Sequence, residues 1–234
     1  MDEAVLDDIL GPRLDWSPVS RPNRAPLRGR FVSLEPFDAD RHAKPLYRAS
    51  HGDNPDPILW TYLSYGPWPD VASYQAWVEE QARSSDPLFF AIVPEGGEAA
   101  GQATYMRIDE TNGVIEIGHI WFGPALQQTR AATETIYLLA KHAFDDLGYR
   151  RFEWKCHARN QRSRNAAARF GFTYEGTFRN AIIQRGRNRD TAWFSITDEE
   201  WPHVRSAFET WLADANFDAD GRQIRSLKEI REAS

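Results

Sequence analysis

The sequence has very little cysteine, no long apolar segment and no sign of an export signal. Its 234 residues include one cysteine, Cys156, which excludes an internal disulfide framework and a cysteine-based zinc site. No uninterrupted apolar run approaches the ~20 residues that a membrane helix needs. The acidic first residues lack the basic and then apolar order of a secretory signal. We therefore expect a cytoplasmic protein that does not enter a membrane.

Several well-known catalytic signatures are also missing. The sequence contains no GxGxxG, Walker, GxSxG, HExxH or EF-hand pattern. Its 6 histidines show no pairing at helical spacing, so we predict no metal site. What is present is 41% hydrophobic residues, 13% aromatic residues and a formal net charge of -6. These values are typical of a folded globular protein.

Positive charge is concentrated in one segment of this acidic chain. Between Tyr149 and Asp190 arginine is frequent and acidic residues are rare. Such a distribution favours the binding of an anion. A solvated basic face is the alternative interpretation.

The hydrophobic pattern predicts one domain of the α/β class, preceded by an arm and followed by a tail. Residues 1–29 are rich in proline and show little periodicity, so we interpret them as an extended arm that lies across the domain. The domain covers residues 30–215, and a helical tail over 216–234 packs on it. No repeat or low-complexity tract marks a further domain.

Within the domain, alternating and helical periodicities predict the following elements. Strands are expected at 30–36, 88–93, 101–108, 114–122, 151–156, 173–184 and 191–197. Helices are expected at 38–50, 71–83, 130–147, 165–170, 198–213 and 223–233, and the turn-rich stretch 51–70 is expected to be a loop. The strands over 88–122 predict an antiparallel meander, and the strand, helix and strand over 114–156 predict a parallel crossover.

The strand over 114–122 leads through a short loop into the start of the longest predicted helix. Unpaired backbone N–H groups and the helix dipole make such a helix start a natural anion site. An ordinary connection between a strand and a helix is the alternative.

These elements and three motifs resemble the GCN5-related N-acetyltransferase (GNAT) superfamily, in particular its ribosomal-protein-alanine acetyltransferase-like branch. The motifs are Gln127-Gln128-Thr129-Arg130-Ala131-Ala132, Asn160-Gln161-Arg162-Ser163 and Phe170-Gly171-Phe172. The resemblance covers residues 27–211. It implies a GNAT-type fold, which is a mixed, mostly antiparallel twisted sheet, splayed where the coenzyme inserts, with helices on both faces. It also implies acetyl-CoA as co-substrate, an amine as acceptor and N-acetyltransferase activity.

The resemblance further implies which residues bind the coenzyme. They are Ile120, Trp121, Phe122, Gln127, Gln128, Thr129, Arg130, Ala131, Ala132, Asn160 and Ser163. Backbone N–H groups of 127–132 are expected to hold the pyrophosphate and Asn160 the pantetheine arm, while an N–H near Trp121 or Phe122 stabilises the oxyanion. Arg130 departs from the family's glycine, which is essential only where φ is positive or a side chain would meet the ligand. In helical geometry, arginine is tolerated and adds a charge near the phosphates.

Glu116 and Ser163 are the catalytic residues that the resemblance implies. Ala167 stands where many members carry the tyrosine that protonates the leaving thiolate, so Ser163 is the implied acid. Glu116 is the expected base, although it also qualifies as a substrate-binding carboxylate, with His119 or a water chain carrying the proton. Regular alternation places the even-numbered residues from Glu116 to Phe122 on one side of the strand and His119 on the other, unless a bulge intervenes.

The acceptor is left open among a protein N-terminus, a small amine, an amino acid and an antibiotic. The aromatic loop around Trp60, Tyr62, Tyr65 and Trp68 is expected to shape the acceptor pocket, with a role in the core as the alternative. Together with Glu116, the first three of these residues are the expected substrate-binding set.

The RGRNRD turn at 185–190 is expected to lie near the acceptor. We expect Arg187 or Arg189 to pair with Asp190 or a nearby carboxylate and to fix the hairpin. Recognition of an acidic acceptor is the functional alternative.

Two other functions stay open from the sequence. A catalytically inactive acyl-CoA sensor is suggested by Arg130 and Ala167. A binding module for RNA or the ribosome is suggested by the arginine-rich region, but the net charge of -6 and the lack of an RNA-binding motif make nucleic acid an unexpected partner. Association as a homodimer is also left open.

Overall fold

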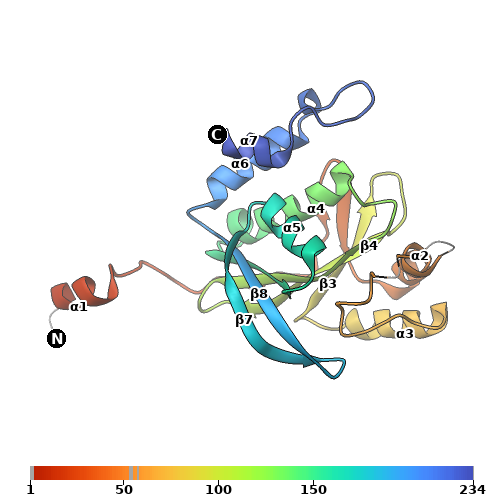
Figure 1. The fold of residues 1–234 in the computed structure, drawn as a ribbon, viewed down its shortest axis with the longest axis horizontal. Coiled ribbons are helices and arrows are strands. Elements are labelled where there is room, and N and C mark those ends of the chain that lie inside the picture. The colour runs from red at the N-terminus through yellow and green to blue at the C-terminus, as the bar shows by residue number, and fades with distance from the viewer. Residues whose placement is uncertain (1–2, 53–54, 57, 234) are drawn as a thin grey trace.

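The computed structural model describes residues 3–52, 55–56 and 58–233, which form an eight-stranded sheet covered by helices (Figure 1). The strands are β1 (Leu27–Arg28), β2 (Val32–Pro36), β3 (Leu88–Pro94), β4 (Gly101–Asp109), β5 (Val114–Phe122), β6 (Arg151–His157), β7 (Thr173–Gln184) and β8 (Arg187–Thr197). Their spatial order is β1-β2-β3-β4-β5-β6-β8-β7. Among the described residues, neighbouring strands are antiparallel except for β5 and β6, which are parallel. The predicted fold class, the meander over β3 to β5 and the parallel crossover are confirmed.

Apart from α1, the helices of the described chain lie on the two faces of this sheet. They are α1 (Glu3–Leu10), α2 (Ala39–His51), α3 (Val71–Gln81), α4 (Arg130–Lys141), α5 (Gln161–Arg169), α6 (Trp201–Leu212) and α7 (Leu227–Glu232). A π-helical turn at His142–Asp146 continues α4, and Gly148 follows it with φ of 77°, a conformation that glycine adopts without steric cost. No helix in the described part of the chain has the length and apolar character needed to cross a bilayer.

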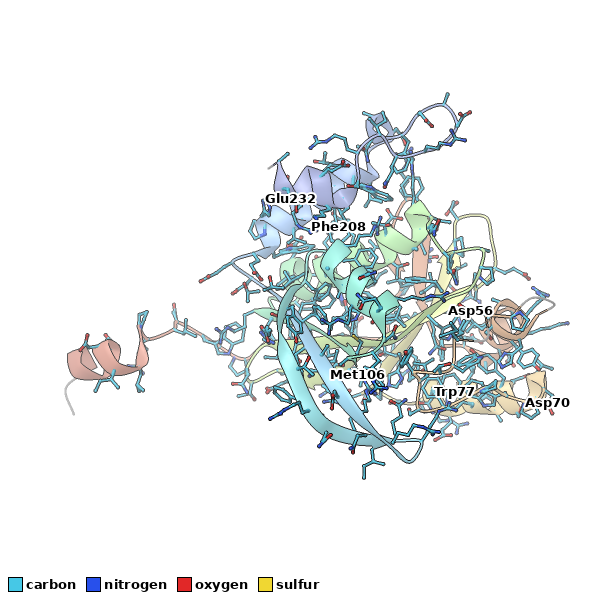
Figure 2. All side chains as sticks on the ribbon, viewed as in Figure 1. Asp56, Asp70, Trp77, Met106, Phe208 and Glu232 are labelled. Atoms are coloured by element: carbon cyan, nitrogen blue, oxygen red, sulfur yellow. The ribbon has the colours of Figure 1, made fainter. Side chains whose placement is uncertain are left out.

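Two hydrophobic clusters hold the helices to the sheet. The first joins the face under α4, α5, α6 and α7, where Ile136 and Phe208 are fully buried. The second joins the opposite face to α2 and α3, where Leu46 and Val78 are fully buried. In Figure 2, Phe208 and Trp77 mark these two sides of the sheet. Burial of each large apolar side chain stabilises the fold by about 1.5–3 kcal/mol.

The prediction for the arm is only partly right. The structure contains α1 and β1 before residue 30, where neither was predicted, and α1 stands clear of the body in Figure 1. The following segment does lie along the domain, because Trp16 donates from Nε1 to the carbonyl of Thr111 and Arg21 pairs with Glu110 at 2.6 Å. Pairing of β1 with β2 ends this segment at the sheet edge.

Several predicted boundaries are wrong for local reasons. α5 begins at Gln161 and not at 165, because the Asn160 side chain caps it by accepting the Ser163 N–H. β8 begins at Arg187 and not at 191, because the hairpin turn consists of Arg185 and Gly186 alone. Both have positive φ, 51° and 71°, as a tight two-residue turn requires.

The remaining boundary errors lie near the C-terminus. α6 begins at Trp201 and not at 198, and α7 covers only Leu227–Glu232 of the longer helix predicted at 223–233. A capping box between Ser226 and Glu229 fixes the start of α7.

Candidate active site

The sheet divides between β5 and β6. Val114–Ile117 of β5 pair with Arg151–Trp154 of β6, and the pairing ends there. The later half of β5 continues beside β4, while Lys155–His157 of β6 pair only with β8 in the described structure. The expected splay is therefore present as a wedge that opens beyond Ile117.

A β-bulge lies in β5 beside this wedge. Gln102 of β4 pairs with Trp121 and Thr104 pairs with Gly118, so two β5 residues face one β4 residue. His119, one of the two, has φ of 49°. The Gln102 amide donates to the His119 carbonyl at 3.0 Å, and the Thr104 hydroxyl donates to the Gly118 carbonyl at 3.0 Å. These two side-chain bonds hold the bulge in place.

The bulge reverses the alternation of β5 after Gly118. The His119 ring packs against Tyr65 and Phe89, which lie on the same side of the sheet as α2 and α3. Glu116 points to that side as well, because the neighbouring Ile115 and Ile117 belong to the opposite cluster. Of the two alternatives that the sequence left open, the structure therefore shows the bulged one, with His119 and Glu116 on the same side of the sheet.

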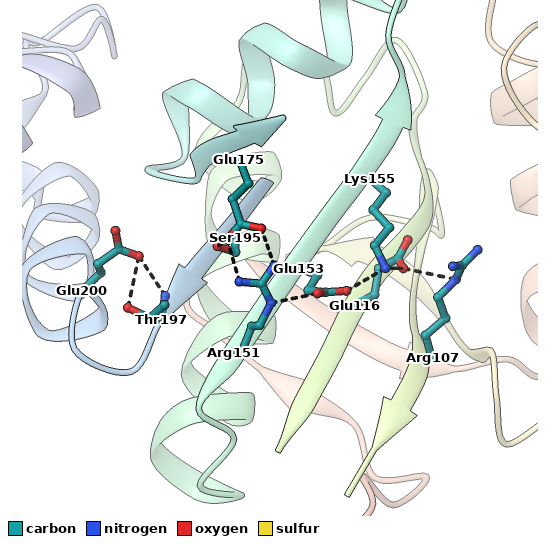
Figure 3. Close-up of polar contacts among 9 residues, drawn as sticks. All are labelled: Arg107, Glu116, Arg151, Glu153, Lys155, Glu175, Ser195, Thr197 and Glu200. Atoms are coloured by element: carbon teal, nitrogen blue, oxygen red, sulfur yellow. Dashed lines mark hydrogen bonds and ion pairs between the residues drawn. The ribbon is translucent and has the colours of Figure 1, made fainter. Parts of the chain in front are cut away.

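Glu116 lies in a buried cluster of charges (Figure 3). Its Oε2 is 3.0 Å from Nζ of Lys155 and 3.3 Å from Nε of Arg107, and the residue is only 4% exposed. Lys155 Nζ also lies 2.7 Å from Glu153. Burial raises the pKa of Glu116, and the two cations act against that rise.

The same cluster continues across the sheet toward β7. Arg151 pairs with Glu153 at 2.8 Å and with Glu175 at 2.6 Å, and the Ser195 hydroxyl donates to Glu175 at 2.6 Å. Figure 3 shows these contacts running from Arg107 on β4 to Glu175 on β7. Charged side chains and the Ser195 hydroxyl thus connect β4, β5, β6, β8 and β7.

His119 forms a second polar group on this face. Its Nδ1 is 3.0 Å from the Tyr65 hydroxyl, which also accepts from the Gln102 amide at 2.9 Å. Burial, with Arg107 and Arg189 nearby, lowers the pKa of His119 to about 4, so the ring is neutral at pH 7. Burial raises the pKa of Tyr65, so the phenol keeps its proton. The arrangement that satisfies both groups has Tyr65 donating to Nδ1, which leaves the proton of the ring on Nε2.

In the loop before α4, some of the predicted backbone N–H donors are free and the others form hydrogen bonds within the loop. The N–H of Gln127 bonds to Gly123, that of Thr129 bonds to Leu126, and that of Ala132 bonds to the Thr129 side chain, which caps the helix. Within the described residues, the N–H groups of this stretch that have no acceptor belong to Gln128, Arg130 and Ala131.

Arg130 occupies the glycine position of the motif without strain. It is the first helical residue of α4, and the positive φ of the loop, 62°, falls on Gln128. The Arg130 guanidinium stacks on Phe217, with Cζ 3.4 Å from the ring centroid, and its Nη1 lies 2.9 Å from Asp214. The side chain is therefore engaged by the C-terminal segment, and its expected role as a charge near the phosphates stays a prediction.

Ser163 lies on the opposite face of the sheet from Glu116. Its hydroxyl oxygen accepts the indole N–H of Trp154 at 2.9 Å, and Trp154 belongs to the cluster under α4 and α5. The Asn160 side-chain oxygen is occupied as the cap of α5, whereas its amide nitrogen has no acceptor among the described residues. Glu116 and Ser163 thus flank the wedge from its two sides and do not touch.

The aromatic loop combines core packing with contacts to the site. Trp60 is 6% exposed and packs on Trp68 and Trp121 at ring distances of 5.1 and 5.9 Å, so it is a core residue. Tyr62 lies at the end of β6, with its ring 5.3 Å from His157. Tyr65 is the predicted substrate-binding residue that, among those described, hydrogen-bonds to His119.

The tip of the β7–β8 hairpin fastens this loop. Arg185 donates from Nη2 to the carbonyls of Trp60, Leu63 and Gly66 at 3.2–3.4 Å. The amide of Gln184 donates to the carbonyl of Tyr62 at 3.1 Å. Loop and hairpin therefore close over the same end of β5 and β6.

Among the described residues, the predicted ion pair of the hairpin does not form. Asp190 instead accepts the backbone N–H of Asn180 at a bulge of β7, at 2.8 Å. Arg187 donates to the carbonyl of Arg185, and Arg189 donates to the side chain of Gln184 at 3.3 Å. Backbone and amide contacts shape the hairpin where the sequence suggested charge pairing.

Two hollows open near these elements. One of about 370 Å³ is lined partly by the aromatic loop and includes Tyr47, His51, Trp60 and Arg185 in its lining. Another of about 250 Å³ lies between the end of α2 and the start of the loop before α4, at Gly123–Ala125.

Sequence reasoning missed the cations around Glu116. Arg107 reaches it through a second bulge, in β4, and Lys155 reaches it from β6. A signal for Lys155 did exist, because Glu153 and Lys155 alternate with apolar residues in a strand of the sheet centre. The position of Arg107 carried no such signal.

Comparisons with known proteins agree with this geometry. The family model described as acetyltransferase (GNAT) domain matches residues 32–173. A crystal structure of a GCN5-related N-acetyltransferase from Brucella melitensis is 45% identical, with a TM-score of 0.90, and the match covers 93% of this chain and 99% of that chain.

Two curated relatives are more distant. The ribosomal-protein-serine acetyltransferase of Escherichia coli K12 is 27% identical over 150 residues, which is 61% of this chain and 80% of that protein. A Bacillus subtilis protein named as a ribosomal N-acetyltransferase is 27% identical over 105 residues, which is 45% of this chain and only 57% of that relative.

The split sheet, the capped helix start and these matches together define an N-acetyltransferase fold. The chain belongs to the GNAT acetyltransferase family. The resemblance inferred from the motifs, including that to the ribosomal-protein acetyltransferase branch, is confirmed.

Proposed function

We propose that this protein transfers an acetyl group from acetyl-CoA to an amine, with Glu116 as the base and Ser163 as the acid. The observation that carries the proposal is the wedge between β5 and β6, because it is flanked by a buried carboxylate on one face and a hydroxyl on the other. The acceptor amine belongs to a small molecule or to a protein N-terminus. The name of the Escherichia coli relative supports the protein acceptor.

The residues around the wedge suit the coenzyme. The free N–H groups of Gln128, Arg130 and Ala131 point from a helix start, where phosphate oxygens are favoured. The free amide of Asn160 is a donor for the carbonyls of the pantetheine arm. When bound, the coenzyme supplies a thioester, which is an activated acetyl group.

Glu116 is suited to accept the proton of the amine. Its raised pKa makes it a stronger base than an exposed carboxylate, while Lys155 and Arg107 keep it ionised before the reaction. Ser163 accepts from Trp154 and also hydrogen-bonds to the side chain of Cys156, so its hydroxyl must turn from Cys156 to give its proton to the departing thiolate. A backbone N–H of β5 beyond the bulge is the proposed donor to the oxyanion.

Kinetics of Glu116→Gln test this assignment. We expect kcat to fall by ~10² to 10⁴, with the Kd for acetyl-CoA unchanged, because the substitution is nearly isosteric and lies away from the α4 loop. Glu175→Gln is the matched control, because it removes a carboxylate at the far end of the same charge cluster. Thiol release should be measured with a panel of amines.

Three results would contradict the proposal. A raised KM with kcat intact would make Glu116 a substrate-binding group only. An unchanged pH–rate profile in the variant would move the base to His119 or to water. Stabilisation by acetyl-CoA without thiol release on any amine would favour a sensor.

A further inference from the structure

Three polar side chains of β8 line up on the sheet face that holds Glu116. Arg189, Thr191 and Trp193 occupy alternate positions, so they point to one side of the strand. The ring of Trp193 lies 3.7 Å from Nζ of Lys155, which is the ion-pair partner of Glu116. We refer to these three residues as the β8 donor row.

Each member of the β8 donor row carries a buried polar atom that has no partner. Nε of Arg189, Oγ1 of Thr191 and Nε1 of Trp193 are all buried without a hydrogen bond to any described residue. Thr191 is itself only 5% exposed. Leaving such a group unpaired costs about 1–3 kcal/mol, so three in one row form an arrangement that a ligand would stabilise.

Arg189 is also a cation without a counter-ion in the described part of the chain. Its one hydrogen bond goes to the neutral amide of Gln184, and no carboxylate among the described residues lies within ion-pair distance of it. The side chain is half-buried, and that burial lowers its pKa. Nearby cations of the same region, such as Lys155 and Arg151, are paired with carboxylates.

The position of Arg189 places it at the acceptor side of the wedge. The strand order sets β8 directly beside β6, and Arg189 extends past the end of β6, where Thr191 pairs with His157. It is close enough to interact electrostatically with Glu116 and to help lower the pKa of His119. The hairpin tip that follows is fastened to the aromatic loop.

We propose that the acceptor amine carries a carboxylate group, and that the β8 donor row binds it. The inference rests on the proposed amine acetylation and narrows its substrate to amino acids, acidic peptides or related amino-carboxylates. One planar guanidinium with two neutral donors matches the single negative charge and the two coplanar oxygens of a carboxylate. A phosphate would require more positive charge than Arg189 provides, because Lys155 and Arg107 are already paired with Glu116.

Paired acceptors provide the first test. The first comparison uses dipeptides with amidated C-termini, with Ala-Asp and Ala-Glu as acids and Ala-Asn and Ala-Gln as their amides. The second compares the free amino acids L-aspartate and L-glutamate with their diamides. We expect the acid of at least one pair to have a ~10-fold to 100-fold higher kcat/KM than its amide, as one charge-assisted contact provides. Arg189→Gln should reduce that ratio to about 1 by raising KM, with kcat unchanged, and Arg189→Lys should keep part of it.

Arg187→Gln is the matched control, because Arg187 is an exposed arginine of the same hairpin that bonds only to the carbonyl of Arg185. It should leave the acid preference unchanged. A melting temperature measured without ligand separates a loss of recognition from a loss of folding in each variant.

A binding measurement distinguishes failure of this inference from failure of the proposed function. Succinate, but not succinamide, should raise the melting temperature of the wild-type protein in the presence of coenzyme A, and Arg189→Gln should abolish the rise. If succinate stabilises the protein in this way but no amine is acetylated, the carboxylate site is supported and the proposed reaction is overturned. Acetylation with equal rates for acids and amides would overturn the carboxylate site alone. Stabilisation by inorganic phosphate and not by succinate would also overturn it.

Discussion

Replacing Lys155 by methionine measures how much one ammonium group contributes to the charge cluster beside the wedge. The Lys155 side chain is 7% exposed, and Nζ lies 3.0 Å from Glu116 and 2.7 Å from Glu153. With an effective dielectric constant of about 20, Coulomb's law gives about 6 kcal/mol for each pair. Desolvation of the ammonium offsets much of this attraction. We therefore expect the variant to lose about 3–5 kcal/mol in free energy of unfolding at pH 7, as a broken buried pair does.

The expected loss depends on pH in a defined direction. Burial already raises the pKa of Glu116, and Lys155 is the largest influence against that rise, so its removal raises this pKa further. A carboxyl whose pKa is higher in the folded than in the unfolded state favours folding when it is protonated. The destabilisation should therefore shrink as the pH falls from 8 toward the ordinary value of 4.5, by up to ~1.4 kcal/mol per pH unit for one proton.

Urea unfolding at several pH values between 5 and 8 checks this reasoning. Lys228→Met is the control, because Lys228 forms an exposed pair with Glu232 at 3.6 Å, and such pairs contribute little. A loss below about 1 kcal/mol for Lys155→Met, or a loss that does not change with pH, would refute the account of the cluster.

Three further outcomes follow from the site. Asn160→Ala should lower the free energy of unfolding, measured in urea, by about 1 kcal/mol through loss of the α5 cap. Asn160→Asp should keep the cap and raise only the KM for acetyl-CoA. Equal stability of the wild-type protein and both variants would contradict the capping role. Ala132→Asp should weaken coenzyme A binding at least ~10-fold in calorimetry, because its carboxylate repels the phosphates. Arg130→Gly retains the backbone N–H, so it should change the affinity less than ~3-fold. Unchanged affinity in Ala132→Asp would exclude the loop before α4 as the phosphate site. The His119 ring should show no titration by NMR between pH 5 and 8, because its pKa is about 4; a midpoint near 6.5 would mean that the ring is exposed.

The elements that the sequence predicted well depend on local patterns. β5 has the predicted bounds, Val114–Phe122, because its apolar run lies between a glycine turn and a short loop. α4 begins at the predicted Arg130, because Thr129 is a strong N-cap residue. These signals act within a few residues, so they survive in any tertiary context.

The parts of the site that escaped prediction depend on pairing between strands. The bulge at His119 is held by side chains of β4, and no alternation within β5 reveals it. Arg107 and Lys155 meet Glu116 from strands on either side. Arg189 does not pair with its neighbour Asp190, because the fold engages Asp190 with the backbone of β7.

The C-terminal segment has a practical consequence for how the protein is handled. Arg130 at the start of α4 stacks on Phe217, and Arg231 of α7 donates to the carbonyls of Ala168 and Arg169 at the end of α5. Truncation or a bulky affinity tag at this end would therefore disturb both helices that begin beside the wedge. α1 stands apart from the body in Figure 1, so a tag joined there leaves them undisturbed. Binding data from proteins tagged at opposite ends should be compared only after this difference has been measured.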